Sequence, residues 1–275
     1  MKHYLTTKDH FLTQERFELW HHPEMDYLET RPVPEHIEKY YQSDDYISHG
    51  TSKKTFFTVL YSWAKSLNLR SKYNLIKKLH PTAKTICDIG TGTGDFLHYL
   101  QEKGFEVYGT EPNEKARTTA TNKGISVCEH LGQLPRQQFD MITLWHVLEH
   151  LPDLDQSISN ITSLLEANGK LLVAVPNYKS YDAQYYKHYW AAYDTPRHLW
   201  HFSRNSIEAI FRKHRMKIET TKGMPLDAFY VSLLSEKYKN GHHRYFSAFI
   251  IALLSNIQAI QSKEHSSRIY VLRKT

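Results

Sequence analysis

The sequence predicts an α/β protein whose core is a doubly wound, mostly parallel sheet. Two short apolar runs, at residues 84–89 and 105–109, have the length and composition of buried strands. A glycine-rich turn from Gly90 to Gly94 and an amphipathic segment separate them, so this stretch reads strand, turn, helix, strand. Glu111 follows the second strand, where its carboxylate can accept hydrogen bonds from both hydroxyls of a ribose. This order is typical of one nucleotide-binding half of such a sheet.

The sequence ahead of this core predicts a helical N-terminal appendage and lid over residues 1–79, followed by the main domain over residues 80–275. Prolines and scattered aromatic residues up to residue 33 indicate short strands or turns, and a helix is expected from residue 34 or 35 to about 42. Apolar side chains recur at helical spacing farther along the chain, at Phe56, Phe57, Leu60, Trp63, Ala64 and Leu67. A second helix is expected at about 72–79.

The stretch between residues 46 and 87 contains no Asp or Glu but many lysines. One interpretation is a helical lid with a solvated lysine face. The other is a basic wall that attracts an anionic substrate.

The rest of the main domain alternates helices and strands. Amphipathic segments predict helices at about 114–123, 153–167 and 203–214, the last capped by Ser203. Apolar runs predict five further strands, at 125–128, 139–144, 170–175, 216–223 and 268–272. Together with the first two strands, these make a seven-stranded sheet.

The spacing of the glycines distinguishes between nucleotide ligands. Dinucleotide-binding turns have the spacing Gly-x-Gly-x-x-Gly, which brings a pyrophosphate to a helix N-terminus. Here the pattern is Asp88-x-Gly90-x-Gly92-x-Gly94 followed by Asp95, whose carboxylate would repel a pyrophosphate but suits a cationic ligand. The motif resembles the first motif of the class I S-adenosylmethionine-dependent methyltransferases. An NAD-dependent dehydrogenase is the less favoured alternative.

A second motif strengthens this resemblance. The strand that contains Phe139 and Asp140 is followed by Val147-Leu148-Glu149-His150, a familiar companion of the glycine motif in these methyltransferases. The resemblance covers residues 84–175 most strongly and is of the small-molecule type. It implies a Rossmann-like sheet whose last strand runs antiparallel beside the fifth, with S-adenosylmethionine as methyl donor and S-adenosylhomocysteine as product.

The resemblance places the methyl donor outside the carboxyl ends of the strands. The residues that it implies as cofactor-binding are Asp88, Gly90, Thr91, Gly92, Gly94, Asp95, Phe96, Glu111, Pro112, Leu131, Trp145 and His146. Leu131 is expected against the adenine, and Trp145 and His146 beside the sulfonium. His146 either orients the donor, removes a substrate proton or only packs beneath the cofactor.

The segment at residues 194–203 is rich in aromatic and ionisable side chains and resembles a segment of small-molecule methyltransferases of this class. We expect it to close the pocket, with Tyr178, Asp194 and Arg197 binding the substrate and Arg197 gripping an acidic group. His198 and His201 are alternative catalytic bases. The competing interpretation is a lid that is held together by an Asp194–Arg197 pair and stacked aromatic rings.

An insertion at about 225–266 carries a regular apolar helical stripe, formed by Phe246, Phe249, Ile250, Leu253, Leu254, Ile257 and Ile260. Packing in the core or in a homodimer is the preferred interpretation. A helix on a membrane surface is the alternative, because Lys237, Lys239 and Arg244 flank the stripe.

Composition limits the remaining possibilities. Cys87 and Cys128 lie in predicted strands, so we expect neither a disulfide framework nor a cysteine metal site. No signal region and no run of about 20 apolar residues is apparent, so the expected location is the cytoplasm. Nucleic acid is a disfavoured partner, because the chain has neither a Pro-Pro-(Tyr/Phe) turn after the fourth strand nor a Pro-Cys nucleophile.

The predicted function is methyl transfer to oxygen or nitrogen of a small-molecule or glycan acceptor, which the basic stretch suggests is anionic. The alternative of a different class is a non-catalytic S-adenosylmethionine-binding scaffold or regulator. The resemblance implies no resident metal.

Overall fold

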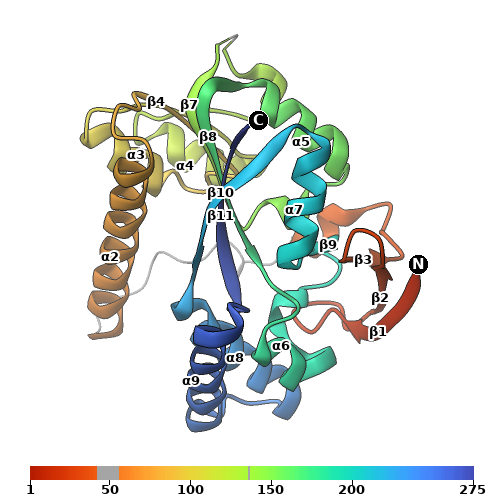
Figure 1. Cartoon of the computed structure of the whole chain (residues 1–275). Helices are drawn as coiled ribbons and strands as arrows, with labels where there is room; N and C mark the ends of the chain where they lie inside the picture. Colours follow the sequence, from red (N-terminus) through yellow and green to blue (C-terminus); the bar gives the residue numbers. More distant parts are fainter. Residues whose placement is uncertain (42–55, 136) are drawn as a thin grey trace.

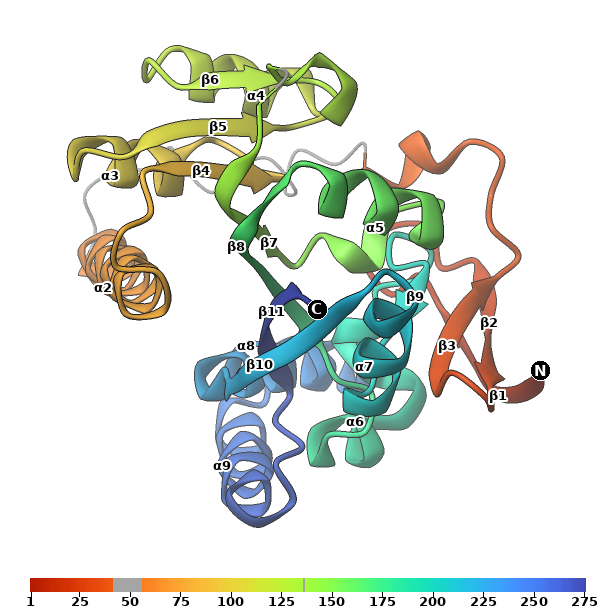
Figure 2. The same ribbon diagram turned by 45° about the horizontal axis from the view of Figure 1, so that its top comes forward.

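The computed structural model describes residues 1–41, 56–135 and 137–275, and for residues 56–64 it describes the backbone. Its centre is a seven-stranded sheet with the order β10-β11-β8-β7-β4-β5-β6 (Figures 1 and 2). The strands are β4 (Thr85–Ile89), β5 (Glu106–Thr110), β6 (Ser126–Cys128), β7 (Phe139–Trp145), β8 (Leu165–Pro176), β10 (Met216–Gly223) and β11 (Ser267–Lys274). The neighbours from β8 to β6 pair in parallel, and β11 lies antiparallel between β8 and β10. The predicted antiparallel last strand beside the fifth is therefore confirmed.

Alternate residues of these strands face two separate helical layers. Ile142 and Leu144 of β7 pack on the side of α5 (Leu154–Ser163) and α7 (Arg204–Lys213). Met141 packs on the opposite side, with α3 (Asp95–Glu102) and the end of α2 (Phe56–Leu79). Because both faces are covered, the central strands β4 and β7 are buried at most positions, and their mainly apolar runs could be recognised from the sequence.

The N-terminal region forms a sheet of its own, so the prediction of a helical appendage is wrong for this part. Strands β1 (Lys2–Lys8), β2 (Arg16–His22) and β3 (Tyr27–Arg31) pair antiparallel, and β3 also pairs with β9 (Trp200–His201). The alternation of buried and exposed side chains in β2 is that of a strand with one buried face, since Phe17 and Leu19 are buried while Arg16 and Glu18 are exposed. The short strands expected before residue 33 are confirmed. In place of the helix expected up to residue 42 stands a 3₁₀ turn, η1 (Ile37–Tyr41).

The two helices predicted before the core are one continuous helix, α2. Most of its predicted apolar face, from Phe56 to Ala64, lies outside the described side chains. Leu67, the last member of that face, is 45% exposed, whereas Ile76 near the end of α2 is fully buried against the sheet.

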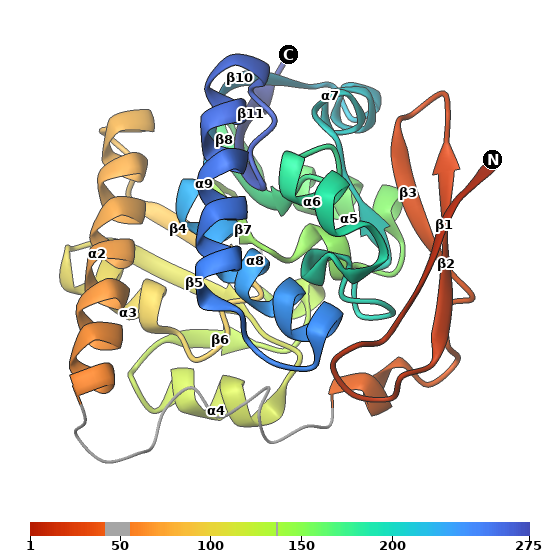
Figure 3. The same ribbon diagram turned by 90° about the horizontal axis from the view of Figure 1, so that it is seen from below.

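The insertion consists of two adjacent helices, α8 (Pro225–Asn240) and α9 (Tyr245–Ser262) (Figures 1 and 3). The expectation that the large apolar stripe of α9 lies in the core is wrong, because Phe246 is 80% and Ile257 54% exposed. The small side of the helix is buried instead, at Ala248, Ala252, Ser255 and Ala259. By length and composition alone α9 is also long and apolar enough to cross a membrane, although 28% of it is buried.

The remaining elements connect the strands. They are α4 (Glu114–Thr121), η2 (Leu131–Gln133), η3 (Leu148–His150), α6 (Tyr181–Tyr186), η4 (Lys187–Tyr189) and η5 (Ala191–Tyr193). Strand β8 starts five positions earlier than predicted, since Leu165 already pairs with Phe139 before a register shift leads to the Met141–Lys170 pair.

Candidate functional site

The carboxyl ends of β4, β5 and β7 meet at one edge of the central sheet, because these strands are parallel neighbours. The glycine turn crosses this edge immediately after β4. The backbone amides of Gly90 and Thr91 both donate to the carbonyl oxygen of Thr110 at the end of β5, at 2.8 and 3.0 Å. The turn is thus fixed to two strands at the point where the sequence predicted the methyl donor. We call this place the donor edge.

The glycines of the turn serve different purposes. All three have positive φ angles. A Cβ atom at Gly94 would lie 2.7 Å from Cβ of Ala120, so this glycine is required for packing between α3 and α4. A Cβ atom at Gly92 would meet nothing within 4 Å. The backbone at Gly92 therefore faces open space, as expected of a turn that a ligand approaches closely.

Glu111 stands at the mouth of this turn, directly after β5. One carboxylate oxygen, Oε2, accepts a hydrogen bond from the Gly92 amide at 2.8 Å, and Oε1 accepts one from the Asn113 amide at 2.9 Å. Both bonds fix the carboxylate against the turn while leaving each oxygen with further acceptor capacity. Pro112 follows it, and Leu131 lies on η2 just after β6 and is partly buried. The expected contacts of Glu111 with the ribose and of Leu131 with the adenine stay predictions.

Two acidic residues of the motif are engaged elsewhere. The Asp88 side chain is buried and accepts a hydrogen bond from the Thr143 hydroxyl at 2.5 Å, so it joins β4 to β7. Burial raises the pKa of Asp88 to about 6. Asp95 pairs with Lys123 at 2.8 Å and with Lys65 at 2.7 Å. The expected attraction of Asp95 for a cationic ligand is therefore already met by two lysines of the chain itself.

The aromatic residues at the donor edge surround a third lysine. Nζ of Lys72 on α2 lies 4.0 Å from the ring centroid of Trp145 and 5.1 Å from that of Phe96. The two rings meet edge to face at 5.9 Å. The Trp145 indole nitrogen has no hydrogen-bond partner among the described residues. This edge thus has an aromatic face that attracts positive charge, and the unpaired indole nitrogen of Trp145 is buried beneath the surface.

His146 is clamped between two carboxylates. Its Nδ1 lies 3.4 Å from Oε1 of Glu149, and its Nε2 lies 3.2 Å from Oδ2 of Asp227 on α8. Burial opposes protonation, but the bonds to Asp227 and Glu149 outweigh it and raise the pKa of His146 to about 10. His146 holds its proton in this arrangement, which argues against its role as a base. Its role in orienting the donor stays a prediction.

Glu149, His150 and His198 form a cluster next to this clamp. One donor atom of each side chain lies within 4.8 Å of a donor atom of the other two. Glu149 and His150 belong to η3, which follows β7, and the amide of Leu199 donates to the Glu149 carbonyl at 2.8 Å, so that His198 is held beside them. Burial lowers the pKa of His150 to about 4. Nδ1 of His150 lies 2.9 Å from the backbone carbonyl oxygen of Arg197.

The predicted substrate residues instead fix the lid to the N-terminal sheet. Arg197 is 1% exposed and donates to Asp194 at 2.5 Å and to Asp9 at 3.0 Å. The Tyr178 hydroxyl donates to Asp26 at 2.9 Å and is also buried. Because its donors are taken up by Asp9, Asp194 and the Tyr40 carbonyl, Arg197 is not placed to grip an acidic substrate. The competing interpretation, a lid held by the Asp194–Arg197 pair, agrees with the structure.

His201 is also part of this lid contact. Thr30 donates its single hydroxyl proton to the His198 carbonyl at 2.7 Å, so the 2.9 Å contact between Thr30 and Nε2 of His201 is donated by the imidazole. Burial holds the pKa of His201 well below its usual value. His201 therefore joins β9 to β3 and is not placed as a base, whereas His198 remains beside the donor edge.

Comparison with known proteins agrees with this geometry. The methyltransferase domain family matches residues 61–219, more than half of the chain. The chain belongs to the class I S-adenosylmethionine-dependent methyltransferase family.

Two curated relatives match this methyltransferase domain. An uncharacterized methyltransferase of Alkaliphilus oremlandii is 27% identical over 124 residues, which is 38% of this chain and 57% of the relative. A ubiquinone biosynthesis O-methyltransferase of Coxiella burnetii is 29% identical over 124 residues, 41% of this chain and 53% of the relative. The chain thus spans about half the length of these relatives.

Solved structures share the methyltransferase fold. The magnesium protoporphyrin IX methyltransferase of Synechocystis PCC 6803 with bound SAH has a TM-score of 0.56 at 17% identity, covering 87% of this chain and 98% of that one. A SAM-dependent methyltransferase of Archaeoglobus fulgidus has a TM-score of 0.52 at 18% identity, covering 80% of this chain and 100% of the other.

The residues at the donor edge fit the cofactor of this methyltransferase family. The open space at Gly92, the acceptor oxygens of Glu111 and the aromatic face of Trp145 are features that an adenosine with a sulfonium can use. Lys72 lies over the indole ring, so a bound sulfonium would require its ammonium group to move aside.

Three residues near this methyltransferase site were not assigned a role from the sequence. Glu149 stands in the second motif, and its place just past the end of a buried strand was an available signal. Asp227 reaches His146 from α8, and Lys72 reaches Trp145 from α2. These two come from distant parts of the chain, so local sequence patterns hold no signal for them.

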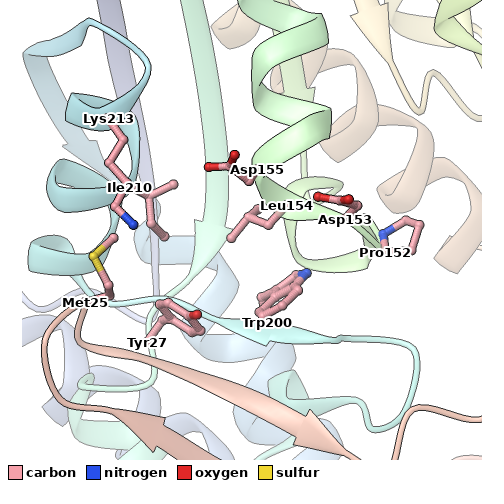
Figure 4. A pocket seen from close by; sticks show the side chains of 9 residues that line it. All are labelled: Met25, Tyr27, Pro152, Asp153, Leu154, Asp155, Trp200, Ile210 and Lys213. Atoms are coloured by element: carbon pink, nitrogen blue, oxygen red, sulfur yellow. The ribbon is translucent and has the colours of Figure 1, made fainter.

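A cavity of about 380 Å³ lies between the β2–β3 turn, the start of α5 and α7 (Figure 4). The cavity is lined by Met25, Tyr27, Pro152, Asp153, Leu154, Asp155, Trp200, Ile210 and Lys213. None of these belongs to the predicted cofactor or substrate residues, so this cavity is distinct from the donor edge.

Proposed function

We propose that this protein transfers the methyl group of S-adenosylmethionine to an oxygen atom of a small-molecule acceptor. The observation that carries this proposal is the concentration of ionisable side chains just past the end of β7. Glu149, His150 and His198 lie together there, beside the ion pairs of His146. A hydroxyl acceptor must lose a proton around the time of transfer, whereas a neutral amine already has a free electron pair.

S-adenosylmethionine supplies a methyl group made electrophilic by the sulfonium. The chain has to align the acceptor oxygen in line with that methyl group and to exclude water, which can account for much of the rate. In this proposal Glu111 and the backbone at Gly92 position the adenosine, and the Trp145 ring lies beside the sulfonium. The cluster around Glu149 receives the acceptor hydroxyl.

Two further observations favour oxygen over nitrogen as the target atom. The Coxiella burnetii relative is named as an O-methyltransferase. In addition, no carboxylate of the described residues forms an ion pair with His198 of the cluster, whereas His146 pairs with two carboxylates. A glycan hydroxyl is an acceptor of the same chemistry and falls within the proposal.

The test is transfer of an isotopically labelled methyl group to panels of phenols and catechols, sugar alcohols, carboxylic acids and amines. We expect label in the oxygen acceptors together with one S-adenosylhomocysteine per methyl group. Transfer to amines alone would contradict the proposal. Binding of S-adenosylhomocysteine without any transfer would favour the non-catalytic alternative.

A further inference from the structure

We propose that Glu149, His150 and His198 bind one divalent transition-metal ion. The part of this proposal that concerns the acceptor rests on the proposed function, whereas ion binding itself does not. Among the residues that the structure describes, this is the one group of three or more His, Cys, Asp and Glu side chains that brings donor atoms within 4.8 Å of each other.

Both imidazoles have the tautomer that binding of a metal through Nε2 requires. Nδ1 of His150 lies 2.9 Å from the Arg197 carbonyl oxygen, and Nδ1 of His198 lies 2.9 Å from the Ala192 carbonyl oxygen. A carbonyl only accepts, so each Nδ1 carries the proton and each Nε2 keeps its lone pair. A backbone carbonyl that fixes the tautomer through the other ring nitrogen is the usual support of a metal-binding histidine.

Glu149 supplies an independent observation. Its side chain is 1% exposed, and neither carboxylate oxygen has a hydrogen-bond partner among the described residues. Its nearest ionic contact is His146, 3.4 Å from Oε1. Protonated His146 partly balances the charge at Oε1, whereas Oε2 has no such contact among the described residues, and a buried carboxylate oxygen without a donor or cation is unfavourable. A bound cation next to His150 and His198 would meet this need.

The spacing and the kinds of donor limit the choice of ion. Ligands bound to one ion at about 2.0–2.2 Å lie about 3–4 Å apart, so the donor atoms, which lie within 4.8 Å of one another, must approach by up to about 1–2 Å. Two imidazoles and one carboxylate suit Zn²⁺, Co²⁺, Fe²⁺ or Mn²⁺ better than Ca²⁺ or Mg²⁺, which prefer all-oxygen sites.

Three protein ligands leave at least one coordination position open. We infer that this position takes the acceptor oxygen, because η3 follows β7 at the donor edge. A hydroxyl bound to a divalent ion loses its proton to water far more readily than a free one. The ion would thus promote loss of the acceptor proton. His146 cannot remove this proton, because it is held between Glu149 and Asp227.

The experiment uses the untagged full chain after dialysis against EDTA. Titration with Zn²⁺, followed by calorimetry, and with Co²⁺, followed by its visible absorption, measures affinity, stoichiometry and geometry without donor or acceptor. We expect one ion per chain at micromolar or tighter Kd. His150→Gln and His198→Gln are each expected to weaken binding by at least about tenfold.

The matched control is His130→Gln, which alters a histidine that is 67% exposed and far from the cluster in the sequence. It should leave ion binding unchanged, and S-adenosylhomocysteine binding should show that all three variants are folded. Absence of binding in the wild type, or equal affinity in the cluster variants and the wild type, would overturn the proposal. If the ion binds but only amines are methylated, the proposed function fails while the metal site stands.

Discussion

At the level of single residues, Arg197 joins parts of the chain that are far apart in sequence. Its guanidinium lies between Asp194 in the lid and Asp9 near the N-terminus. The side chains of Arg197 and Asp9 are buried, and that of Asp194 is partly exposed. Substituting Arg197→Ala would leave two carboxylates without their partner. We expect a loss of about 3–5 kcal/mol in the free energy of unfolding, measured with urea.

The control for this prediction is Lys39→Ala, since Lys39 pairs with Glu15 at the surface and the two side chains are 50% and 48% exposed. Its loss should leave stability close to that of the wild type. At the same time Arg197→Ala protein that remains folded should bind S-adenosylhomocysteine as the wild type does. A normal stability together with a raised KM for the acceptor would restore Arg197 as a substrate ligand.

Asp26 makes stability depend on pH. It lies in the β2–β3 turn and accepts hydrogen bonds from Lys179, Tyr178, Ser203 and His21. Burial works against its ionisation, but these bonds outweigh burial and lower the pKa of Asp26 from 3.8 to about 2.

Because the folded pKa is depressed, the stabilisation is complete above about pH 4 and is lost as the pH falls toward 2. The stability difference between wild type and Asp26→Asn should therefore be largest above pH 4 and shrink below it. Unfolding curves at a series of pH values measure this. A difference that stays constant from pH 6 to pH 3 would show that Asp26 is not tied to the lid in this way.

At the level of elements, the orientation of α9 can be tested by paired substitutions. Ala252 is fully buried on the small side of the helix, and Phe246 on the large side is 80% exposed. Ala252→Leu should overpack the contact with α8 and cost about 1–3 kcal/mol. Phe246→Ala should change the free energy of unfolding by no more than about 0.5 kcal/mol. The opposite ranking would mean that the large stripe faces inward after all.

The elements that the sequence predicted well are those whose pattern is local. Strands β4, β5 and β7 are covered on both faces, so their apolar runs are continuous and their ends are marked by glycine or charge. The pairing of β9 with β3 joins residues about 170 positions apart, and no local pattern reports it. The orientation of α9 was missed because both of its sides are apolar, and contacts with α8 and α6 favour the small one.

The same distinction holds for the site. The glycine turn and Glu111 follow from spacing along one supersecondary unit, and the structure places them together. The roles of His146 and Arg197 depend on Asp227 and Asp9, which approach from other parts of the chain. From the sequence such a side chain is predicted to be a base or an anion-binding group. In the folded chain it forms a structural ion pair with a carboxylate that the sequence pattern does not report.

At the level of the whole molecule, the N-terminal sheet and the methyltransferase domain share a buried ion pair, a strand pairing and the contacts of Asp26. These contacts cross the predicted boundary at residue 79, because they join residues 1–31 to residues 178–203. We therefore expect one cooperative thermal unfolding transition, with coincident curves from far-ultraviolet and near-ultraviolet circular dichroism. Two separate transitions would show that the N-terminal sheet folds independently.

The central claim is that the methyl donor binds at the donor edge, with Glu111 holding the ribose. Calorimetric titration with S-adenosylhomocysteine, using wild type, Glu111→Ala and the exposed control Glu102→Ala, tests it most directly. We predict micromolar binding that Glu111→Ala weakens by about tenfold or more and Glu102→Ala leaves unchanged, because a lost hydrogen bond to a charged acceptor is worth about 1.5–3 kcal/mol. Equal affinity in all three proteins, or binding of NAD in place of S-adenosylhomocysteine, would contradict the claim.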